Sequence, residues 1–432
     1  MEIYICLVRY NRVSRLKIVI LTSLQVIPSV SGTRKLIYDT AIELAKREHE
    51  VLVVSVATES KRIFSATKIG NVVFVKIPLR RPLHELLAAI RFVVYSTFPR
   101  FQFILPWLYQ RFLKAGGMDL SRLLEGTCYD ALICEDSRIF ATALKIRSET
   151  GTPIVYRLHS IEAISNVTGA PFASSPPSVL IPIASEISRR IEEKAIRGSN
   201  LILTLSSDDS KVVRSIYGIN SEYIGVGAET EEYQVDDTFV RQHILGHGRY
   251  LLYVSSYLGG MNTVIKAAEA LPKHCFVIVG KASTLVGASN IPDNIKLLGI
   301  VSEKALEALY KYAKAVLVPM SWNPGLGVPV KFVEALARGK PVIVSLDVSK
   351  TLIGIDHCRN AIVFDTFSEL LEDIELIFDN HRLEKKLARE AKRYAVENLS
   401  WTEIIGKLEK SLEKLRLTSP HRDDERNSSA RF

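Results

Sequence analysis

The feature that most constrains the fold is a regular alternation of short apolar runs with longer segments of helical periodicity. The short runs are typical of strands buried on both faces, and the longer segments carry an apolar stripe at helical spacing. Buried strands that alternate with helices predict β-α-β units and a parallel sheet. In the first half of the chain we expect strands at 17–21, 51–56, 72–77, 131–134, 153–158 and 201–205, and helices at 33–48, 138–149, 184–197 and 207–217.

The same alternation starts again after a polar stretch, so the chain contains two such units. The second unit has expected strands at 250–254, 276–279, 295–298, 315–319, 342–345 and 361–364, and helices at 262–271, 303–313, 328–338, 367–379, 381–397 and 402–415. The predicted parts are an N-terminal extension (1–15), a first Rossmann-like domain (16–230), a linker (231–249), a second Rossmann-like domain (250–400), a closing helix (401–417) and a disordered polar tail (418–432).

Two doubly wound α/β domains that face each other across a cleft suggest what kind of reaction the chain performs. Ligands bind at the carboxyl ends of the strands in such sheets. Two facing sheets therefore bind two ligands, or two halves of one. This arrangement suits group transfer, because closure of the domains excludes water from the reacting atoms.

Composition narrows the class of protein. With 432 residues, of which 47% are hydrophobic and 24% charged, the chain is globular rather than disordered or collagen-like. Its five cysteines are scattered and lack C-x-x-C spacing, so neither a disulfide framework nor a zinc site is expected. We therefore expect a cytoplasmic protein. No apolar run is long enough for a transmembrane helix, and residues 1–15 make a poor signal peptide.

The net charge of +9 allows nucleic acid, an anionic membrane or a phosphorylated small molecule as partner. The segment 91–114 is rich in aromatic and basic residues, a mixture that can lie at a membrane interface, here the inner membrane face. The alternative is a set of core helices with snorkelling basic ends, since Pro99 and Pro106 break any long amphipathic helix. Nucleic acid is not expected as a partner, because no RNA-binding signature accompanies the aromatic residues.

Two glycine-containing loops carry the candidate chemistry. Gly32 comes just before a predicted helix, where backbone N–H groups can bind an anion, although a plain turn would also use a glycine. The dinucleotide pattern G-x-G-x-x-G is absent, which argues against NAD. The stronger segment is 324–345, in which two glycines precede a helix that carries Lys331 and Glu334 on one face. Lys331 can bind a diphosphate and Glu334 ribose hydroxyls; the alternative is a solvated ion pair.

At these segments the chain resembles glycosyltransferase family 4, retaining enzymes of the GT-B fold, over about residues 17–405. The segments that carry the resemblance are SGTRKLIYDTAIELAKREHEVLVVS, YRLHSIEAI, EEKAIRGSNLILTLSSDDSKVV, YIGVGAETEEY, FVIVGKAS, NIKLLGIVSEKALEALYKYAKAVLVPM and GLGVPVKFVEALARGKPVIVS. The resemblance implies transfer of a sugar from a nucleotide-diphosphate sugar to a hydroxyl acceptor, with retention. That acceptor is a glycan, a lipid-linked molecule or a small molecule. The resemblance implies no cofactor, only the nucleotide-diphosphate sugar as donor substrate, and the absence of a D-x-D motif fits a site without metal.

The resemblance also implies roles for individual residues. Lys331 and Glu334 would hold the diphosphate and the ribose, and His159 would contact the transferred sugar. Gly32 would lie near the donor phosphates and the acceptor. Backbone groups would line the same pocket at Ser321, Gly325, Leu326, Gly327 and Val328, and the donor would pass near Gly280 and Lys281.

Two departures from the family pattern keep other functions open. Leu326 stands where many members carry the first glutamate of an E-x7-E motif. The stretch 255–267 has no arginine or lysine before Lys266, so one phosphate-binding charge is lost or supplied elsewhere. The alternatives are a nucleotide-sugar epimerase of the same architecture and a degenerate, non-catalytic protein that binds nucleotide sugars.

Overall fold

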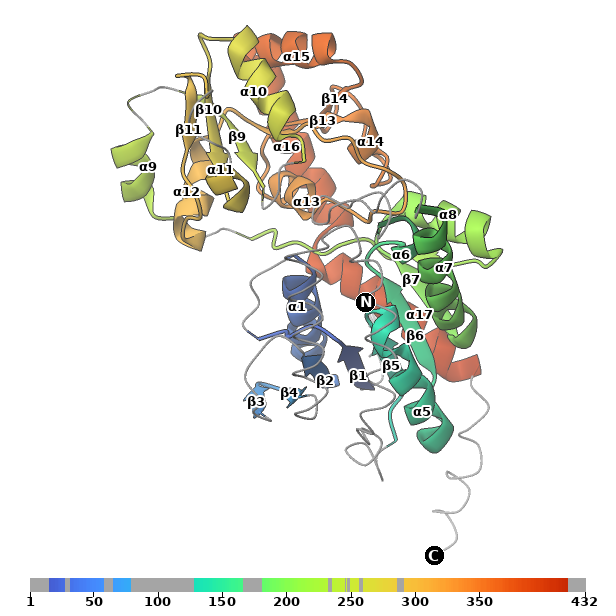
Figure 1. Cartoon of the computed structure of the whole chain (residues 1–432). Coiled ribbons are helices and arrows are strands. Elements are labelled where there is room, and N and C mark those ends of the chain that lie inside the picture. Colours follow the sequence, from blue (N-terminus) through green and yellow to red (C-terminus); the bar gives the residue numbers. More distant parts are fainter. Residues whose placement is uncertain are drawn as a thin grey trace, which may run out of the picture.

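A computed structural model of the chain describes two α/β domains, each built on one sheet (Figure 1). The described residues are 15–27, 32–57, 65–78, 128–165, 181–231, 235–244, 246, 249–255, 259–285 and 291–418. Predictions for the segment 91–114 lie outside them, as do nearly all of the N-terminal extension and the polar tail. Within the described residues, no helix combines the length and the apolar character that a membrane span needs.

The N-terminal sheet has eight strands in the order β3-β4-β2-β1-β5-β6-β7-β8. All neighbours are parallel except β3, which pairs antiparallel with β4 at the edge. The strands are β1 (Lys17–Thr22), β2 (Glu50–Ala57), β3 (Ser65–Ile69), β4 (Val72–Pro78), β5 (Ala131–Cys134), β6 (Ile154–Leu158), β7 (Leu201–Thr204) and β8 (Glu222–Tyr223). Six of them were predicted. Strand β3 was missed because all its residues are exposed, so no apolar pattern marks it.

The C-terminal sheet is wholly parallel, in the order β11-β10-β9-β12-β13-β14. Its strands are β9 (Tyr250–Val254), β10 (Cys275–Val279), β11 (Ile295–Leu297), β12 (Ala315–Val318), β13 (Val342–Ser345) and β14 (Ile362–Phe364). The order reverses between β9 and β12, which is where such a sheet opens a crevice for ligands. The predicted doubly wound fold is therefore confirmed in both domains.

Helices connect the strands of both sheets. In the N-terminal domain they are α1 (Gly32–Lys46), η2 (Ser137–Ile139), α5 (Phe140–Thr150), α6 (Glu162–Ser165), α7 (Ile181–Gly198) and α8 (Ser207–Tyr217). In the C-terminal domain they are α10 (Met261–Ala270), α11 (Lys281–Leu285), α12 (Glu303–Tyr312), α13 (Val330–Ala337), α14 (Leu346–Ser349), α15 (Phe367–Asp379) and α16 (His381–Asn398). Helix α10 packs with α15 and α13 with α16, on opposite sides of the sheet (Figure 1).

The predicted linker contains a short helix, α9 (Asp237–His243), which packs on α12. Lys311 of α12 binds the carboxylate of Asp237 at 3.1 Å. This helix was not predicted, because its polar composition is typical of a loop. Part of the segment 231–249 thus packs with the C-terminal domain.

The last helix, α17 (Trp401–Thr418), crosses back to the N-terminal domain and packs on α1 (Figure 1). Glu409 on its inner face lies 2.9 Å from Nε2 of the buried His49 and also pairs with Arg47. Helix α17 therefore links the C-terminal domain, through α16, to α1 of the N-terminal domain.

Candidate active site

The loop between β12 and α13 meets the N-terminal domain directly. The N–H of Ile161 donates to the carbonyl oxygen of Gly325 at 2.6 Å. In the opposite direction, the N–H of Gly325 donates to Oδ1 of Asp209 at 2.9 Å. The structure thus joins two segments singled out in the sequence, 156–164 and 324–345, at the carboxyl edges of their sheets.

Both glycines of this loop are needed where they stand. Gly325 has φ +97°, and a Cβ there would lie 2.6 Å from Cδ1 of Ile164. Gly327 has φ +78°, and a Cβ would lie 2.1 Å from the carbonyl oxygen of His159. Only glycine combines a positive φ with so close an approach. The indole of Trp322 donates to the Gly327 carbonyl oxygen at 2.9 Å and fixes the loop from within.

Lys331 and Glu334 lie on the first turns of α13, next to this loop. Nζ of Lys331 lies 2.7 Å from Oε2 of Glu334, and the side chains are 34% and 16% exposed. The helix begins at Val330, whose Cγ2 lies 3.5 Å from where a Cβ of Gly32 would be. The N-termini of α1 and α13, one from each domain, therefore lie close together. The free N–H groups and the dipole of a helix N-terminus favour an anion.

Helix α1 also carries a cation, Lys35, near the domain boundary. Lys35 pairs with Asp39 at 3.0 Å. Burial alone would lower the pKa of Lys35, but the carboxylates of Asp39, Glu303 and Glu334 raise it. Lys35 is thus within electrostatic reach of Glu334 across the domain boundary, and it stays protonated.

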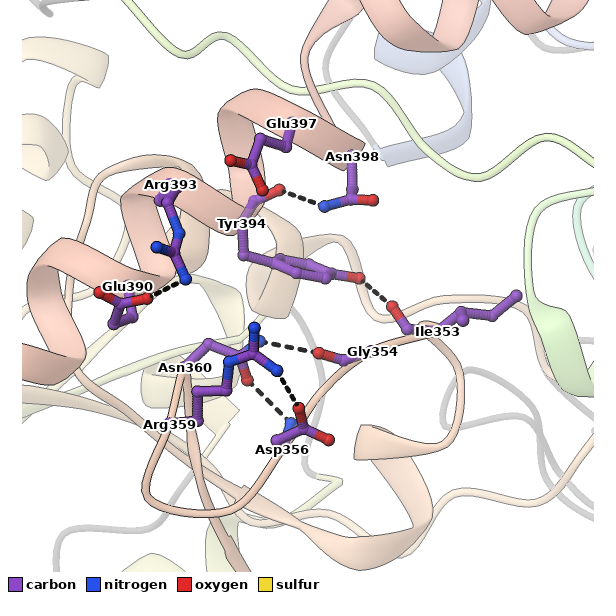
Figure 2. A pocket seen from close by; sticks show the side chains of 10 residues that line it. All are labelled: Ile353, Gly354, Asp356, Arg359, Asn360, Glu390, Arg393, Tyr394, Glu397 and Asn398. Carbon is purple, nitrogen blue, oxygen red and sulfur yellow. Dashed lines mark hydrogen bonds and ion pairs between the residues drawn. The ribbon is translucent and has the colours of Figure 1, made fainter.

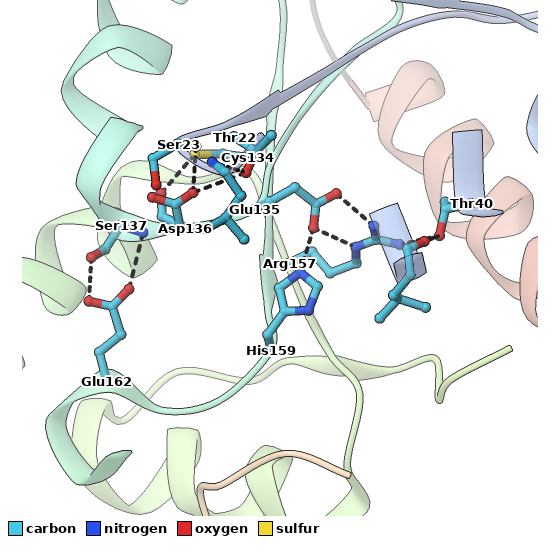
Figure 3. Close-up of polar contacts among 12 residues, drawn as sticks. Thr22, Ser23, Thr40, Cys134, Glu135, Asp136, Ser137, Arg157, His159 and Glu162 are labelled. Atoms are coloured by element: carbon cyan, nitrogen blue, oxygen red, sulfur yellow. Dashed lines mark hydrogen bonds and ion pairs between the residues drawn. The ribbon is translucent and has the colours of Figure 1, made fainter. Parts of the chain in front are cut away.

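On the N-terminal side, His159 is part of a buried ionic cluster (Figure 3). Its Nε2 lies 2.7 Å from Oε2 of Glu135, a residue that directly follows β5. Arg157 binds the same carboxylate with two nitrogens, at 2.8 and 2.7 Å, and its third nitrogen donates to Thr40 of α1 at 3.1 Å. Arg157 is 2% exposed, so its charge depends on Glu135 for compensation.

The contact with Glu135 selects one tautomer of a neutral His159 ring. Burial would raise the pKa of Glu135, but Arg157 and His159 outweigh it and hold that pKa below its usual value. Glu135 is therefore ionised at neutral pH and only accepts hydrogen bonds. The proton of a neutral His159 ring must then be on Nε2, which leaves a lone pair on Nδ1. The ring is held in one tautomer and one orientation.

Neighbouring carboxylates accept hydrogen bonds from loops at the same edge of the sheet (Figure 3). Asp136 accepts the N–H of Ser23 at 2.8 Å and so fixes the end of β1, where the loop to Gly32 begins. Glu162 accepts the hydroxyl of Ser137 at 2.6 Å. Glu192 accepts the N–H groups of Glu162 and Ala163 and so caps α6; burial, together with the charge of Glu162, raises the pKa of Glu192 to about 8.

The remaining predicted site residues lie around the same edge of the C-terminal sheet. Ser321 lines a cavity of about 400 Å³ at the ends of β12, β13 and β14, and Lys266 also lines it. Leu326 and Val328 are half-buried against the core. Gly280 approaches Ser255 so closely that a Cβ would lie 2.2 Å from the Ser255 carbonyl oxygen. Lys281 is exposed at the start of α11.

A second cavity, of about 260 Å³, lies between α16 and the loop that follows α14 (Figure 2). Its two arginines are already paired, Arg359 with Asp356 at 2.9 Å and Arg393 with Glu390. None of the predicted site residues lines it. We therefore locate the candidate site at the facing helix N-termini.

Sequence reasoning missed Glu135, Arg157 and Asp209. Two of them carried a signal: an arginine inside the apolar run at 153–158 needs a buried carboxylate, and acidic residues directly follow the run at 131–134. Asp209 had no such signal, because only the approach of the C-terminal domain gives it partners.

Two family models match the chain in succession. The model described as Glycosyltransferase Family 4 matches residues 30–231, and the model described as Glycosyl transferases group 1 matches residues 236–394. The chain is a family 4-type glycosyltransferase with the GT-B fold. The two matches cover the N-terminal and C-terminal domains of this glycosyltransferase respectively, and their boundary falls just before α9. No curated protein matches it significantly.

Solved structures share the fold of the glycosyltransferase at low identity. Sucrose-phosphate synthase from Thermosynechococcus elongatus is 14% identical with a TM-score of 0.69, over 92% of this chain and 99% of that one. Anabaena Alr3699/HepE, solved with UDP and glucose, is 15% identical with a TM-score of 0.64, over 93% and 100%. A UDP-forming trehalose-phosphate synthase from Burkholderia xenovorans, solved with glucose-6-phosphate, is 14% identical with a TM-score of 0.63, over 92% and 100%.

Proposed function

We propose that this glycosyltransferase moves a sugar from a nucleotide-diphosphate sugar to a hydroxyl acceptor, with retention at the anomeric carbon and without a metal ion. The observation that carries the proposal is the meeting of two helix N-termini, at Gly32 and Val330, beside Lys331 and Glu334. Such an arrangement favours a diphosphate, because both helix dipoles and the lysine present positive charge to it.

The Lys331–Glu334 pair has the chemistry to bind the rest of the donor. The two side chains satisfy each other at 2.7 Å and are only partly exposed. A diphosphate can take over the Lys331 ammonium, which leaves the Glu334 carboxylate to accept hydrogen bonds from ribose hydroxyls. Exchange of one partner for another costs little here, since exposed pairs contribute only about 0–1 kcal/mol.

Lys35 supports the absence of a metal requirement. The stretch 255–260 lacks the basic residues that many family members use for the diphosphate, and Lys35 supplies a protonated ammonium from the other domain. Cations and helix N-termini can stabilise a leaving diphosphate as a metal ion does. The bond from the anomeric carbon to the diphosphate oxygen breaks, and the oxygen of the incoming hydroxyl bonds to that carbon on the same face. The leaving diphosphate oxygen takes the proton of that hydroxyl.

His159 is placed to contact the transferred sugar. Its carbonyl oxygen faces Gly327 of the donor loop, and its ring is fixed by Glu135 at 2.7 Å. A ring held in one tautomer can bind a sugar hydroxyl without further loss of side-chain freedom. Similar structures solved with UDP and glucose, or with glucose-6-phosphate, support a nucleotide-sugar donor and a sugar-containing acceptor. A lipid-linked acceptor and cytoplasmic peripheral attachment through 91–114 stay predictions.

The experiment is a calorimetric panel of UDP-, GDP-, ADP- and CMP-sugars with the whole chain and EDTA present. We expect one nucleotide sugar to bind selectively, and that donor to label an acceptor in membrane or glycan extracts with the donor's anomeric configuration. A folded protein that binds none of them contradicts the proposal. Conversion of the donor without any acceptor would instead identify an epimerase, and binding without turnover a degenerate protein.

A further inference from the structure

The first turn of α8 forms hydrogen bonds with two segments of the C-terminal domain. Oδ1 of Asp209 accepts the N–H of Gly325, in the loop that follows β12. Ser207 donates through its N–H to the Thr351 carbonyl oxygen at 3.2 Å and through its hydroxyl to the Lys350 carbonyl oxygen at 2.9 Å, beyond β13. These two C-terminal segments follow neighbouring strands at the edge where the candidate donor site lies.

Asp209 contributes little to its own helix. The N-cap of α8 is Ser206, whose hydroxyl accepts the N–H of Asp208 at 3.2 Å. The side chain of Asp209 is instead buried, at 1% exposure, and its Oδ2 has no hydrogen-bond partner among the described residues. A buried carboxyl that is only half satisfied destabilises a fold. Its compensation comes from the donor loop of the other domain.

We propose that Asp209 is a positioning residue for the donor: it holds the loop Gly325–Gly327 against the N-terminal domain, so that the α13 N-terminus stays aimed at the diphosphate. This inference rests on the proposed function, since it assigns the loop to the donor. Gly325 and Gly327 allow this close contact, because a Cβ at either position would clash with the β6–α6 segment. Loss of the Asp209 carboxylate removes the hydrogen bond from the Gly325 N–H and leaves the one from the Ile161 N–H to the Gly325 carbonyl oxygen.

Closure at this contact is linked to pH. Burial raises the pKa of Asp209 to about 7, in spite of the Gly325 and Gly327 amides. In separated domains the carboxyl meets water and its pKa returns to about 4. Formation of the contact therefore takes up a proton. The equilibrium constant for forming it is highest below pH 7 and falls about tenfold between pH 6 and pH 8.

The charged surroundings of Asp209 do not obscure this effect. Asp208, on the same helix, raises the pKa of Asp209 further. The donor loop brings amides and no charged side chain, and the β6–α6 segment brings His159 and Glu162, which are engaged by Glu135 and Ser137. The C-terminal segment at Ser207 brings Lys350, which contacts α8 through its carbonyl oxygen.

Hydrogen exchange of the full-length protein, read on the peptide 323–330, tests the inference without a ligand. At pH 6 we expect Asp209→Ala to speed exchange of this peptide by about tenfold or more, and Asp209→Asn, which keeps an accepting oxygen, to stay near the wild type. Asp208→Asn is the matched control, since Asp208 pairs with Lys211 at the surface. After correction for intrinsic rates, wild-type protection should fall about tenfold from pH 6 to pH 8 and that of Asp209→Asn should not.

The outcomes separate this inference from the proposed function. Unchanged exchange in Asp209→Ala, in a protein that melts like the wild type, overturns the positioning role. So does a wild-type pH dependence that persists in Asp209→Asn. In parallel, calorimetry with UDP, GDP and ADP should show weaker binding in Asp209→Ala and not in Asp208→Asn. Failure of the wild type to bind any of them contradicts the proposed donor, whereas the exchange result reports on the contact itself.

Discussion

The charged groups on the two sides of the candidate site differ in burial: those on the N-terminal side are buried, and those on the C-terminal side are partly exposed. On the N-terminal side, Glu135, Arg157 and His159 come from two strands and form a buried cluster that also reaches α1 through Thr40. On the C-terminal side, Lys331 and Glu334 lie three residues apart on one helix and remain partly exposed. The first cluster is complete without a ligand, whereas the second pair can exchange its partners.

This difference separates positioning from binding. A buried ion pair is rigid because removal of either partner leaves an uncompensated charge. A partly exposed pair is more easily broken, which suits groups that must bind a donor and then release it. We therefore expect changes at Glu135 to act mainly on stability and changes at Glu334 to act mainly on donor binding.

The largest expected effect is that of Glu135→Ala on the unfolding free energy. Loss of this carboxylate leaves Arg157 buried without a counter-charge, which should cost about 3–5 kcal/mol. Glu334→Ala should cost no more than about 1 kcal/mol. Urea denaturation followed by circular dichroism measures both. Equal losses in the two variants would remove the distinction between the two sides.

The next effect is that of His159→Ala on turnover. The ring is 15% exposed and contacts Glu135 on one side, so its removal leaves the Glu135–Arg157 pair intact. We expect turnover to fall about 100-fold or more with the melting temperature nearly unchanged, as when one preorganised hydrogen-bonding group is deleted. Steady-state kinetics with the selected donor checks this. Retained turnover would show that His159 does not contact the transferred sugar.

The smallest expected effect is a pH dependence of the free energy of unfolding that comes from Glu135. The pKa of Glu135 is lowered in the folded protein, so its contribution is complete above its unfolded pKa of about 4.3 and is lost as pH falls through the folded pKa. The stability gap between wild type and Glu135→Gln should therefore narrow from pH 5 to pH 3. A gap that stays constant would mean that Glu135 is not ionised in the fold.

The sequence predicted the parallel sheets well, because buried strands are marked by uninterrupted apolar runs. Strand β1 and helix α8 lie within about a residue of their expected bounds. Elements without such a pattern were missed, among them the exposed edge strand β3 and the polar helix α9. Their positions depend on pairing and packing with distant segments, which a local pattern does not report.

In the candidate site, too, residues with a local sequence pattern were predicted and residues that depend on long-range contacts were missed. Lys331 and Glu334 were predicted because their three-residue spacing is local, and Gly325 and Gly327 because glycines before a helix have a local meaning. Glu135 lies 22 residues from Arg157 in the chain, and Asp209 lies 116 residues from Gly325. These contacts exist only after the strands are ordered and the domains have met.

The most direct test of the account is a calorimetric titration of the selected nucleotide sugar into wild type, Glu334→Ala and Glu43→Ala. Glu43 forms the same kind of pair with Lys46 on α1, at 2.6 Å and a spacing of three residues, and is the matched control. We expect the Kd to rise about tenfold or more in Glu334→Ala, corresponding to about 1.4 kcal/mol, and to stay unchanged in Glu43→Ala. Equal affinity in all three proteins would show that Lys331 and Glu334 are a solvated ion pair and not the donor site.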